Sequence, residues 1–284
     1  MGSDIAVPVS TGSKGSKTSF HYSFSFLPRR KRNALRTVYT FCRTTDDIVD
    51  NAYDTRSKIE VLHNWRIEFE CALQGKSRYA ILNQLSDIAE KFSIPVVHFY
   101  DLLTGVEIDL LKNRYETFEE LKEYCYLVAS SVGLMSLGIF GPNTERTREY
   151  AINLGIALQL TNIIRDIACD AQYGRIYIPL EDMKKFGYSE NDLFAHRYND
   201  AFISLMEFQA NRAEDYYALA REGLPKEDRK AMFAAKIMER IYYHILLRIR
   251  KNKYNVFLRP VYLSRITQLL IALKYWVKQR IFGM

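Results

Sequence analysis

Two short segments of the chain concentrate carboxylates at helical spacing. They read CRTTDDIVDNAYD and NIIRDIACDAQYGRIYIP, and each contains a DxxxD pair. Five aspartates carry the pattern: Asp46, Asp47 and Asp50 in the first segment, and Asp166 and Asp170 in the second. Because residues i and i+4 lie on one face of a helix, each segment predicts two carboxylates side by side.

A bound cation explains this arrangement better than a solvated helix face does. Paired carboxylates on a helix repel each other, and burial makes that repulsion more costly. The flanking stretches VYTFC and LGIALQLTNII are too apolar on all sides for a surface helix, and the apolar pattern begins well before either cluster. Mg²⁺ takes oxygen ligands from one or two carboxylates and completes its shell with water and phosphate. We therefore expect Mg²⁺ around a diphosphate, with a purely structural cause as the alternative.

Further polar residues extend each aspartate pair into a stripe. Tyr39 and Arg43 fall on the face of the first pair, and Gln159 and Asn162 fall on the face of the second, each stripe within about 60–80° of a helical wheel. Arg43 and Arg165 stand beside the aspartates, where a guanidinium can bind phosphate oxygens bidentately. The alternative is that the arginines only neutralise the aspartates.

The remaining chain predicts long helices. Only 13 glycines and 7 prolines occur in 284 residues, apolar residues recur at helical spacing between the prolines, and alternation typical of strands is nearly absent. We expect one all-α domain over residues 19–284 after a flexible, Ser/Gly-rich leader over 1–18. The longest apolar stretch, 126–140, is shorter than the ~20 residues that span a bilayer. Its small residues favour close helix packing over room for an apolar ligand.

Charge and cysteine content narrow the partners and the compartment. The net charge of +7 suits an anionic partner such as a phosphorylated substrate, a membrane surface or nucleic acid. The four cysteines form no CxxC pair, so we expect buried thiols in a reducing, cytoplasmic compartment. The N-terminal segment lacks the apolar core of a signal peptide.

Three segments together resemble one enzyme family. YTFCRTTDDIVD, LQLTNIIRDIACDAQYGRIYIP and, between them, GVEIDLLKNRYETFEELKEYCYLVASSVGLMS are similar to signatures of the head-to-head prenyl synthases, the squalene and phytoene synthases. The resemblance extends from about residue 19 to 276. It implies a class I terpenoid-synthase helical bundle around a central cavity, prenyl diphosphate substrates and Mg²⁺.

The resemblance also implies residue roles. It implies metal ligands at Asp46, Asp47, Asp50, Asn162, Asp166 and Asp170. It implies substrate contacts at Lys17, Ser19, Tyr39, Gln159, Asn162, Arg165, Tyr242 and Arg259, where Lys17 and Ser19 of SKTSF stand in place of a His or Ser pair. Arg43 and Tyr126 join the paired aspartates Asp46, Asp50, Asp166 and Asp170 as expected catalytic residues.

The family resemblance does not specify the length of the prenyl chain, so the prediction of the substrate depends on the C-terminal segment. That segment looks more like bacterial presqualene diphosphate synthases of hopanoid pathways, which favours the condensation of two farnesyl diphosphates to presqualene diphosphate. The alternative is a phytoene synthase that condenses two geranylgeranyl diphosphates. No GxGxxG nucleotide fingerprint occurs, so an NADPH-dependent second step is not expected. The base is either the released diphosphate or a pocket tyrosine.

Two functions without catalysis fit the sequence less well. The stretch LPRRKRNALR could bind nucleic acid, but no recognition motif accompanies it, and the aspartates would repel phosphate. A metal-free helical scaffold would leave the paired aspartates unexplained.

The chain closes with a basic, apolar segment, YLSRITQLLIALKYWVKQRIFGM. Leu263, Ile266, Leu270, Leu273, Val277 and Ile281 recur in it at helical spacing. We expect residues 263–273 to pack on the domain. We expect the last ten residues, with Trp276 and several basic side chains, to lie on the headgroups of the inner membrane face.

Overall fold

The computed structural model describes residues 23–25, 27–50, 55–142, 144–259 and 261–282, with the side chains of Asp50 and of residues 278–282 outside this set. The leader and the predicted contacts Lys17 and Ser19 therefore lie outside the described residues. The structure is 77% helical, which confirms the all-α prediction. An isolated bridge between Arg114 and Ile176 is the extended pairing in the described part.

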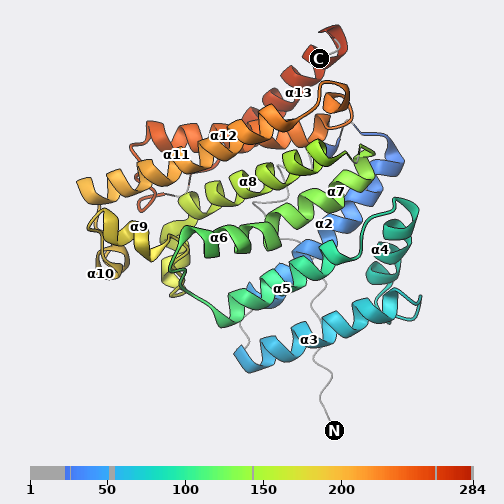
Figure 1. Ribbon diagram of the computed structural model, residues 1–284, viewed down its shortest axis with the longest axis horizontal. Helices are drawn as coiled ribbons and strands as arrows, with labels where there is room; N and C mark the ends of the chain where they lie inside the picture. Colours follow the sequence, from blue (N-terminus) through green and yellow to red (C-terminus); the bar gives the residue numbers. More distant parts are fainter. Residues whose placement is uncertain (1–22, 26, 51–54, 143, 260, 283–284) are drawn as a thin grey trace.

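The helices follow one another with short connections (Figure 1). The first half of the chain forms α2 (Arg29–Asp50), α3 (Thr55–Ala72), α4 (Ala80–Lys91), α5 (Val97–Leu111), α6 (Phe118–Cys125), the π-helix η1 (Tyr126–Ser130) and α7 (Ser131–Phe140). The second half forms α8 (Glu145–Gln172), α9 (Leu180–Lys185), α10 (Glu190–Phe194), α11 (Asp200–Gly223), the 3₁₀ turn η2 (Glu227–Arg229), α12 (Phe233–Lys251) and α13 (Arg265–Phe282).

Helix α8 is the central element of the bundle. It is 28 residues long and packs against α11, α12, α7 and η1, so it has neighbours on most of its circumference (Figure 1). The Thr144 side chain caps its first turn by accepting a hydrogen bond from the Thr147 backbone N–H at 3.2 Å. Buried packing explains why its sequence is apolar on nearly all sides except for the predicted polar stripe.

Helix α2 is held in place by the face opposite its polar stripe. Phe41 packs against Trp65 and Phe69 of α3 and Phe99 of α5, with ring centroids 5.7–6.2 Å apart. The Trp65 indole N–H donates to the Thr45 hydroxyl at 3.0 Å. These buried contacts fix the rotation of α2 about its axis, which leaves its polar stripe directed away from α3.

The small residues of the α6–η1–α7 run serve two purposes. A Cβ at Gly155 of α8 would lie 2.5 Å from the Ser130 Cα, so the backbones of α8 and η1 touch. A Cβ at Gly138 would lie 2.9 Å from Ile94. Ala129 and Gly133 instead line an internal cavity. Close helix packing is therefore confirmed at Ser130 and Gly138. The alternative, room for an apolar ligand, also holds, because Ala129 and Gly133 border the cavity.

Two expectations need revision. Cys42 and Cys125 are buried as expected, but Cys71 is half-buried and Cys169 is exposed on α8, and all four are free thiols.

The expected length of the apolar stretch also needs revision. Helices α6, η1 and α7 join into one apolar helical run, Phe118–Phe140, which among the described residues is long and apolar enough to cross a membrane by length and composition. Half of its most apolar window is buried in the bundle, as a core helix would be.

Candidate active site

A cavity of about 240 Å³ lies between α2, α5, η1, α7, α8 and α12. Six predicted site residues line it: Tyr39, Arg43 and Asp46 of α2, Gln159 and Asn162 of α8, and Tyr242 of α12. The tertiary fold thus brings together the stripes of two helices that lie more than a hundred residues apart in the sequence.

The lining of the cavity changes from apolar to polar along α8. Tyr150, Ala151 and Leu154 line the part nearer the start of the helix, and Gln159 and Asn162 line the part nearer its end. Asp166 and Asp170 follow Asn162 by about 6 and 12 Å along the helix axis. The second aspartate pair therefore stands beyond the polar end of an otherwise apolar cavity.

On α2, the basic member of the stripe is paired with an aspartate. The Arg43 Nη2 lies 2.6 Å from the Asp47 Oδ1, and both side chains are mostly buried. The Arg43 Nε is buried and has no hydrogen-bond partner in the described part of the chain. Asp50 occupies the last position of α2, with its side chain outside the described residues, so its place in the predicted pair stays a prediction.

On α8, a second arginine holds the first aspartate of the pair. The Arg165 Nε donates to the Asp166 Oδ1 at 2.8 Å, and its Nη2 donates to the other carboxylate oxygen. Burial alone would lower the pKa of Arg165, but the hydrogen-bonded Asp166 outweighs this and raises it. The guanidinium therefore stays charged within a mostly buried site.

The surroundings of Asp170, the second aspartate of the pair on α8, disfavour its ionised form. Burial, together with the negative charges of Asp166 and Asp109, raises the pKa of Asp170 to about 7 against the opposing effects of Arg175 and Arg165. About two turns before Asp170 on α8, at the edge of the cavity, the Asn162 Oδ1 is buried and accepts no hydrogen bond from the described residues. Its amide nitrogen donates weakly to the Gln159 Oε1 at 3.3 Å. A bound cation would offset the negative charge of the Asp170 carboxylate, and a cation could also coordinate the Asn162 Oδ1.

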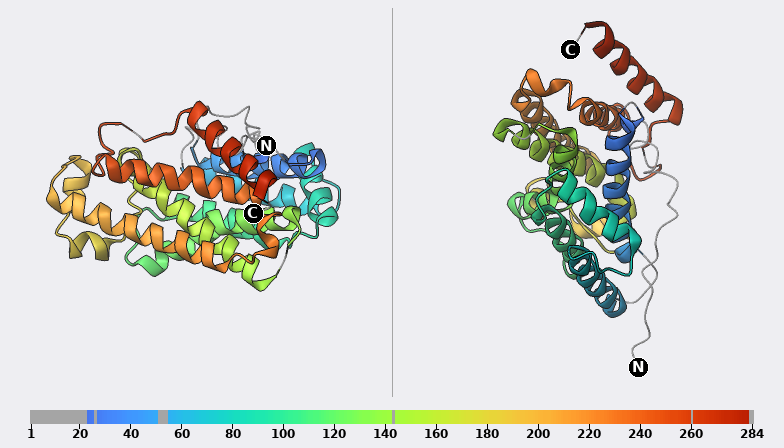
Figure 2. Two further views of the ribbon diagram at one scale, coloured as in Figure 1. Left: turned by 90° about the horizontal axis from the view of Figure 1, so that it is seen from above. Right: turned by 90° about the vertical axis from the view of Figure 1, so that its right-hand side faces the viewer.

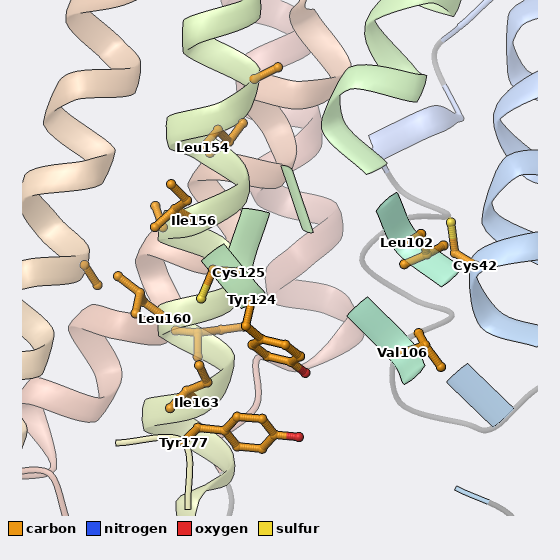
Figure 3. Close-up of a cluster of buried hydrophobic side chains, with 14 of the residues drawn as sticks. Cys42, Leu102, Val106, Tyr124, Cys125, Leu154, Ile156, Leu160, Ile163 and Tyr177 are labelled. Carbon is orange, nitrogen blue, oxygen red and sulfur yellow. The ribbon is translucent and has the colours of Figure 1, made fainter. Parts of the chain in front are cut away.

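Sequence reasoning missed a cluster of three residues next to these aspartates. The hydroxyls of Tyr124 and Tyr177 each donate to Asp109 of α5, both at 2.8 Å. Their rings stack at 5.3 Å, and both hydroxyls point the same way (Figure 3). Burial raises the pKa of both phenols, so they remain protonated donors. The available signal was an aspartate inside the apolar stretch GVEIDLL.

The predicted catalytic tyrosine does not line the cavity. Tyr126 borders a separate recess on the other side of the helix, together with Leu127, Ile152 and Ile156. Residues two positions apart on a helix point about 200° away from each other. Tyr124 therefore faces Asp109 and the acidic end, while Tyr126 faces the recess; the catalytic role expected for Tyr126 stays a prediction, and this geometry does not support it.

The remaining predicted contact, Arg259, is exposed in the segment between α12 and α13 and is not brought to the cavity. Another residue of that segment reaches the site instead. The Arg165 guanidinium lies over the Tyr262 ring at 5.5 Å, and Arg248 donates to the Tyr262 carbonyl oxygen at 3.2 Å. This segment therefore covers part of the second aspartate pair.

The donor set fits Mg²⁺ bound together with a phosphorylated ligand. Within the described residues, no group of three His, Cys, Asp or Glu side chains is close enough to hold a metal ion by itself. Mg²⁺ is commonly held by one or two carboxylates, with water and substrate phosphates as its other ligands. The candidate ligands are the carboxylates of α2 and α8 and the unpaired Asn162 oxygen.

Comparison with known proteins gives a consistent result. The family model for squalene/phytoene synthase matches residues 13–267. The 15-cis-phytoene synthase of Synechocystis sp. is 36% identical over 275 residues, which cover 93% of this chain and 82% of that protein. The phytoene synthase of Arthrospira platensis is 36% identical over 257 residues, covering 86% and 83% of the two chains.

Solved structures share the fold. A dehydrosqualene synthase in complex with ligand superimposes with a TM-score of 0.80 and 32% identity, covering 93% of this chain and 92% of that one. The squalene synthase HpnC from Alicyclobacillus acidocaldarius gives a TM-score of 0.74 with 29% identity, covering 83% and 89%.

Proposed function

Because the chain belongs to the squalene/phytoene synthase family of prenyltransferases, we propose that it joins two geranylgeranyl diphosphates head to head into phytoene. The C-terminal segment had favoured farnesyl diphosphate. The phytoene synthases among the relatives favour the longer substrate, and they match nearly the whole chain rather than its end. The substrate ranking from sequence is therefore reversed.

One observation carries the proposal: two polar helix stripes meet at one end of an apolar cavity. A prenyl diphosphate has the same division into a long apolar chain and a charged head. Arg43 and Asp46 on α2 and Gln159 and Asn162 on α8 would meet the head, while the apolar lining would hold the chain. Arg43 and Arg165 would exchange their present carboxylate partners for diphosphate oxygens.

Metal binding belongs to this proposal. Asp46, Asp47, Asp50, Asn162, Asp166 and Asp170 would hold Mg²⁺, which when bound supplies a Lewis acid that neutralises the departing diphosphate. The arginines assist by holding the same oxygens. The apolar side chains that line the cavity would limit the access of water, which would otherwise quench a carbocation.

The reaction balances without a reductant. The C–O bond of one substrate breaks, and an allylic cation and diphosphate form. The double bond of the second substrate attacks the cation, a proton is lost, and a cyclopropyl diphosphate results. Conversion to phytoene then requires loss of the second diphosphate and of another proton. The apolar product would leave into lipid, which gives peripheral membrane attachment a purpose.

Condensation of two farnesyl diphosphates is the second candidate, since the dehydrosqualene synthase structure is similar over nearly the whole chain. The test is incubation with each prenyl diphosphate and Mg²⁺, with and without NADPH, followed by identification of the products. Phytoene from geranylgeranyl diphosphate, independent of NADPH, is the expected result. Efficient conversion of farnesyl diphosphate with poor use of the longer substrate would replace the first candidate by the second.

A further inference from the structure

The C-terminal helix α13 has two faces, and only one of them is used inside the fold. Gln268, Ile271 and Ala272 are buried, and the helix packs on α12. On the opposite side, five large apolar side chains are exposed to solvent by 39–72%. These residues, here called the outer stripe, are Ile266, Leu269, Leu270, Leu273 and Val277.

The outer stripe is continuous. At about 100° per residue its members span about 100° of the helix circumference, roughly opposite Ile271 and Ala272. The expectation that residues 263–273 pack on the domain is therefore right for Leu263, Ile271 and Ala272 but wrong for Ile266, Leu270 and Leu273. Figure 2 shows α13 on the outside of the bundle.

Positive charge is concentrated in the same part of the chain. Residues 240–284 contain 10 Lys and Arg and no Asp or Glu, whereas the preceding 239 residues contain 30 basic and 33 acidic side chains. The net positive charge of the protein thus comes entirely from its C-terminal part. Exposed Arg265 and Lys274 border the outer stripe on its two sides.

We propose that the outer stripe docks on an anionic membrane surface, with α13 lying in the headgroup plane. An apolar stripe between cations is the pattern of helices that bind there by burying apolar side chains and attracting anionic lipids. The charge imbalance supports lipid rather than a second copy of this basic chain. Size supports it as well: a stripe about 17 Å long and about 10 Å wide covers about 170 Å², against ~800 Å² per partner in a stable dimer.

The position of α13 relates this surface to the cavity. Helix α12 packs on α13 and contributes Met238 and Tyr242 to the cavity lining. A single helix therefore separates the docking surface from the cavity. The benefit to an enzyme with an apolar product rests on the proposed function, whereas the docking itself does not.

The test measures co-sedimentation of the full chain with vesicles, without substrate. One set of vesicles contains phosphatidylglycerol and phosphatidylcholine, and the other contains phosphatidylcholine alone. We expect the wild type to pellet with the anionic set at low salt, and less at high salt. Leu270→Gln with Leu273→Gln should weaken binding by about tenfold or more, because two apolar anchors are lost.

The matched control is Leu219→Gln with Leu247→Gln, which replaces similarly exposed leucines of α11 and α12 outside the outer stripe and should leave binding unchanged. Circular dichroism and size-exclusion chromatography accompany each protein. Equal pelleting of the stripe variant and the wild type, or no pelleting of the wild type, would overturn the proposal. The proposal would also be overturned if the wild type were a dimer and the stripe variant a monomer, since a second copy of the chain would then cover the outer stripe. Because no turnover is measured, failure here is independent of failure of the proposed function.

Discussion

At the scale of single residues, the site is defined by groups whose charges are not balanced inside the protein. Arg43 and Arg165 each hold one aspartate, whereas in the described part of the chain Asp170 is influenced by Arg175 and Arg165 only at a distance and the Asn162 oxygen has no donor. A buried carboxylate next to two others is unfavourable in the ligand-free protein and favourable once a cation arrives. Such a site sacrifices stability for ligand binding.

Asp170 should make the metal-free protein less stable as pH rises. Its pKa is raised from 3.8 to about 7 in the folded state. Between these values the folded protein binds more protons than the unfolded chain, so stability falls as pH increases from about 4 to about 7 and is then constant. Asp170→Asn should stabilise the chelator-treated protein at pH 8 by up to about 4 kcal/mol and have little effect near pH 4. Urea unfolding at both pH values checks this, and a pH-independent effect would contradict it.

The two tyrosines of YCY offer a sharp comparison. Tyr124→Phe removes one of the two hydroxyls that hold Asp109, so we expect kcat to fall by about tenfold or more. Tyr126→Phe changes a recess away from the cavity and should leave kcat within about twofold. Steady-state kinetics on both variants measures this. The reverse order would restore the role that the sequence motif gave to Tyr126.

At the scale of elements, the close approach of α8 and η1 sets where the second stripe points. Gly155 permits backbone contact with Ser130, whose hydroxyl donates to the Ile152 carbonyl at 2.8 Å. The π-turn widens the helix locally, a deviation that is frequent at functional sites. Gln159 and Asn162 lie one and two turns after Gly155 on the same helix, so the contact aligns the polar stripe with the cavity.

Gly155→Ala should therefore affect both stability and activity. The new Cβ would meet backbone atoms, which cannot move independently, and we expect a loss of about 1–3 kcal/mol with a lower kcat. Gly223→Ala is the matched control, because its Cβ would meet nothing nearer than 3.9 Å. Thermal unfolding and kinetics of both variants give the comparison. An unchanged melting temperature in Gly155→Ala would show that the helices separate without cost.

At the scale of the whole molecule, the bundle brings the polar stripes of two helices to one cavity, where a single ligand could contact both. Helices α2 and α8 both line the cavity, and α2 makes its main contacts with α3, α4, α5 and α7. Ligand that bridges the stripes would stabilise the folded protein by mass action, since the unfolded chain has no such site.

Mg²⁺ and inorganic diphosphate should accordingly stabilise the protein together far more than either does alone. At saturating concentrations about 100 times the dissociation constant, the gain is about 2.7 kcal/mol, which raises Tm by roughly 5–10 °C. Asp46→Asn should abolish most of the rise, while the exposed Asp87→Asn on α4 should retain it. Differential scanning fluorimetry measures the shifts. An equal rise with diphosphate alone would argue for an anion site without metal.

The sequence by itself determined the helical class, the two stripes and the residues within them. Helical periodicity is a local property, and it places Tyr39, Arg43 and Asp46 on one face of α2 and Gln159 and Asn162 on one face of α8 whatever surrounds them. The motifs in these stripes also carried the family resemblance, which the comparisons confirm.

Only the tertiary structure decided which faces meet. Asp109, Tyr124 and Tyr177 come together from three separate segments, and no periodicity within one segment could have linked them. Tyr124 and Tyr126 look alike in the motif but point to opposite sides of a helix, so only the packing shows which of them contacts Asp109. The outer stripe of α13 is likewise an apolar pattern that would suit either a core or a surface. The buried Ile271 and Ala272 lie on the face opposite Ile266, Leu270 and Leu273, so the packing of α13 on α12 leaves the latter three exposed.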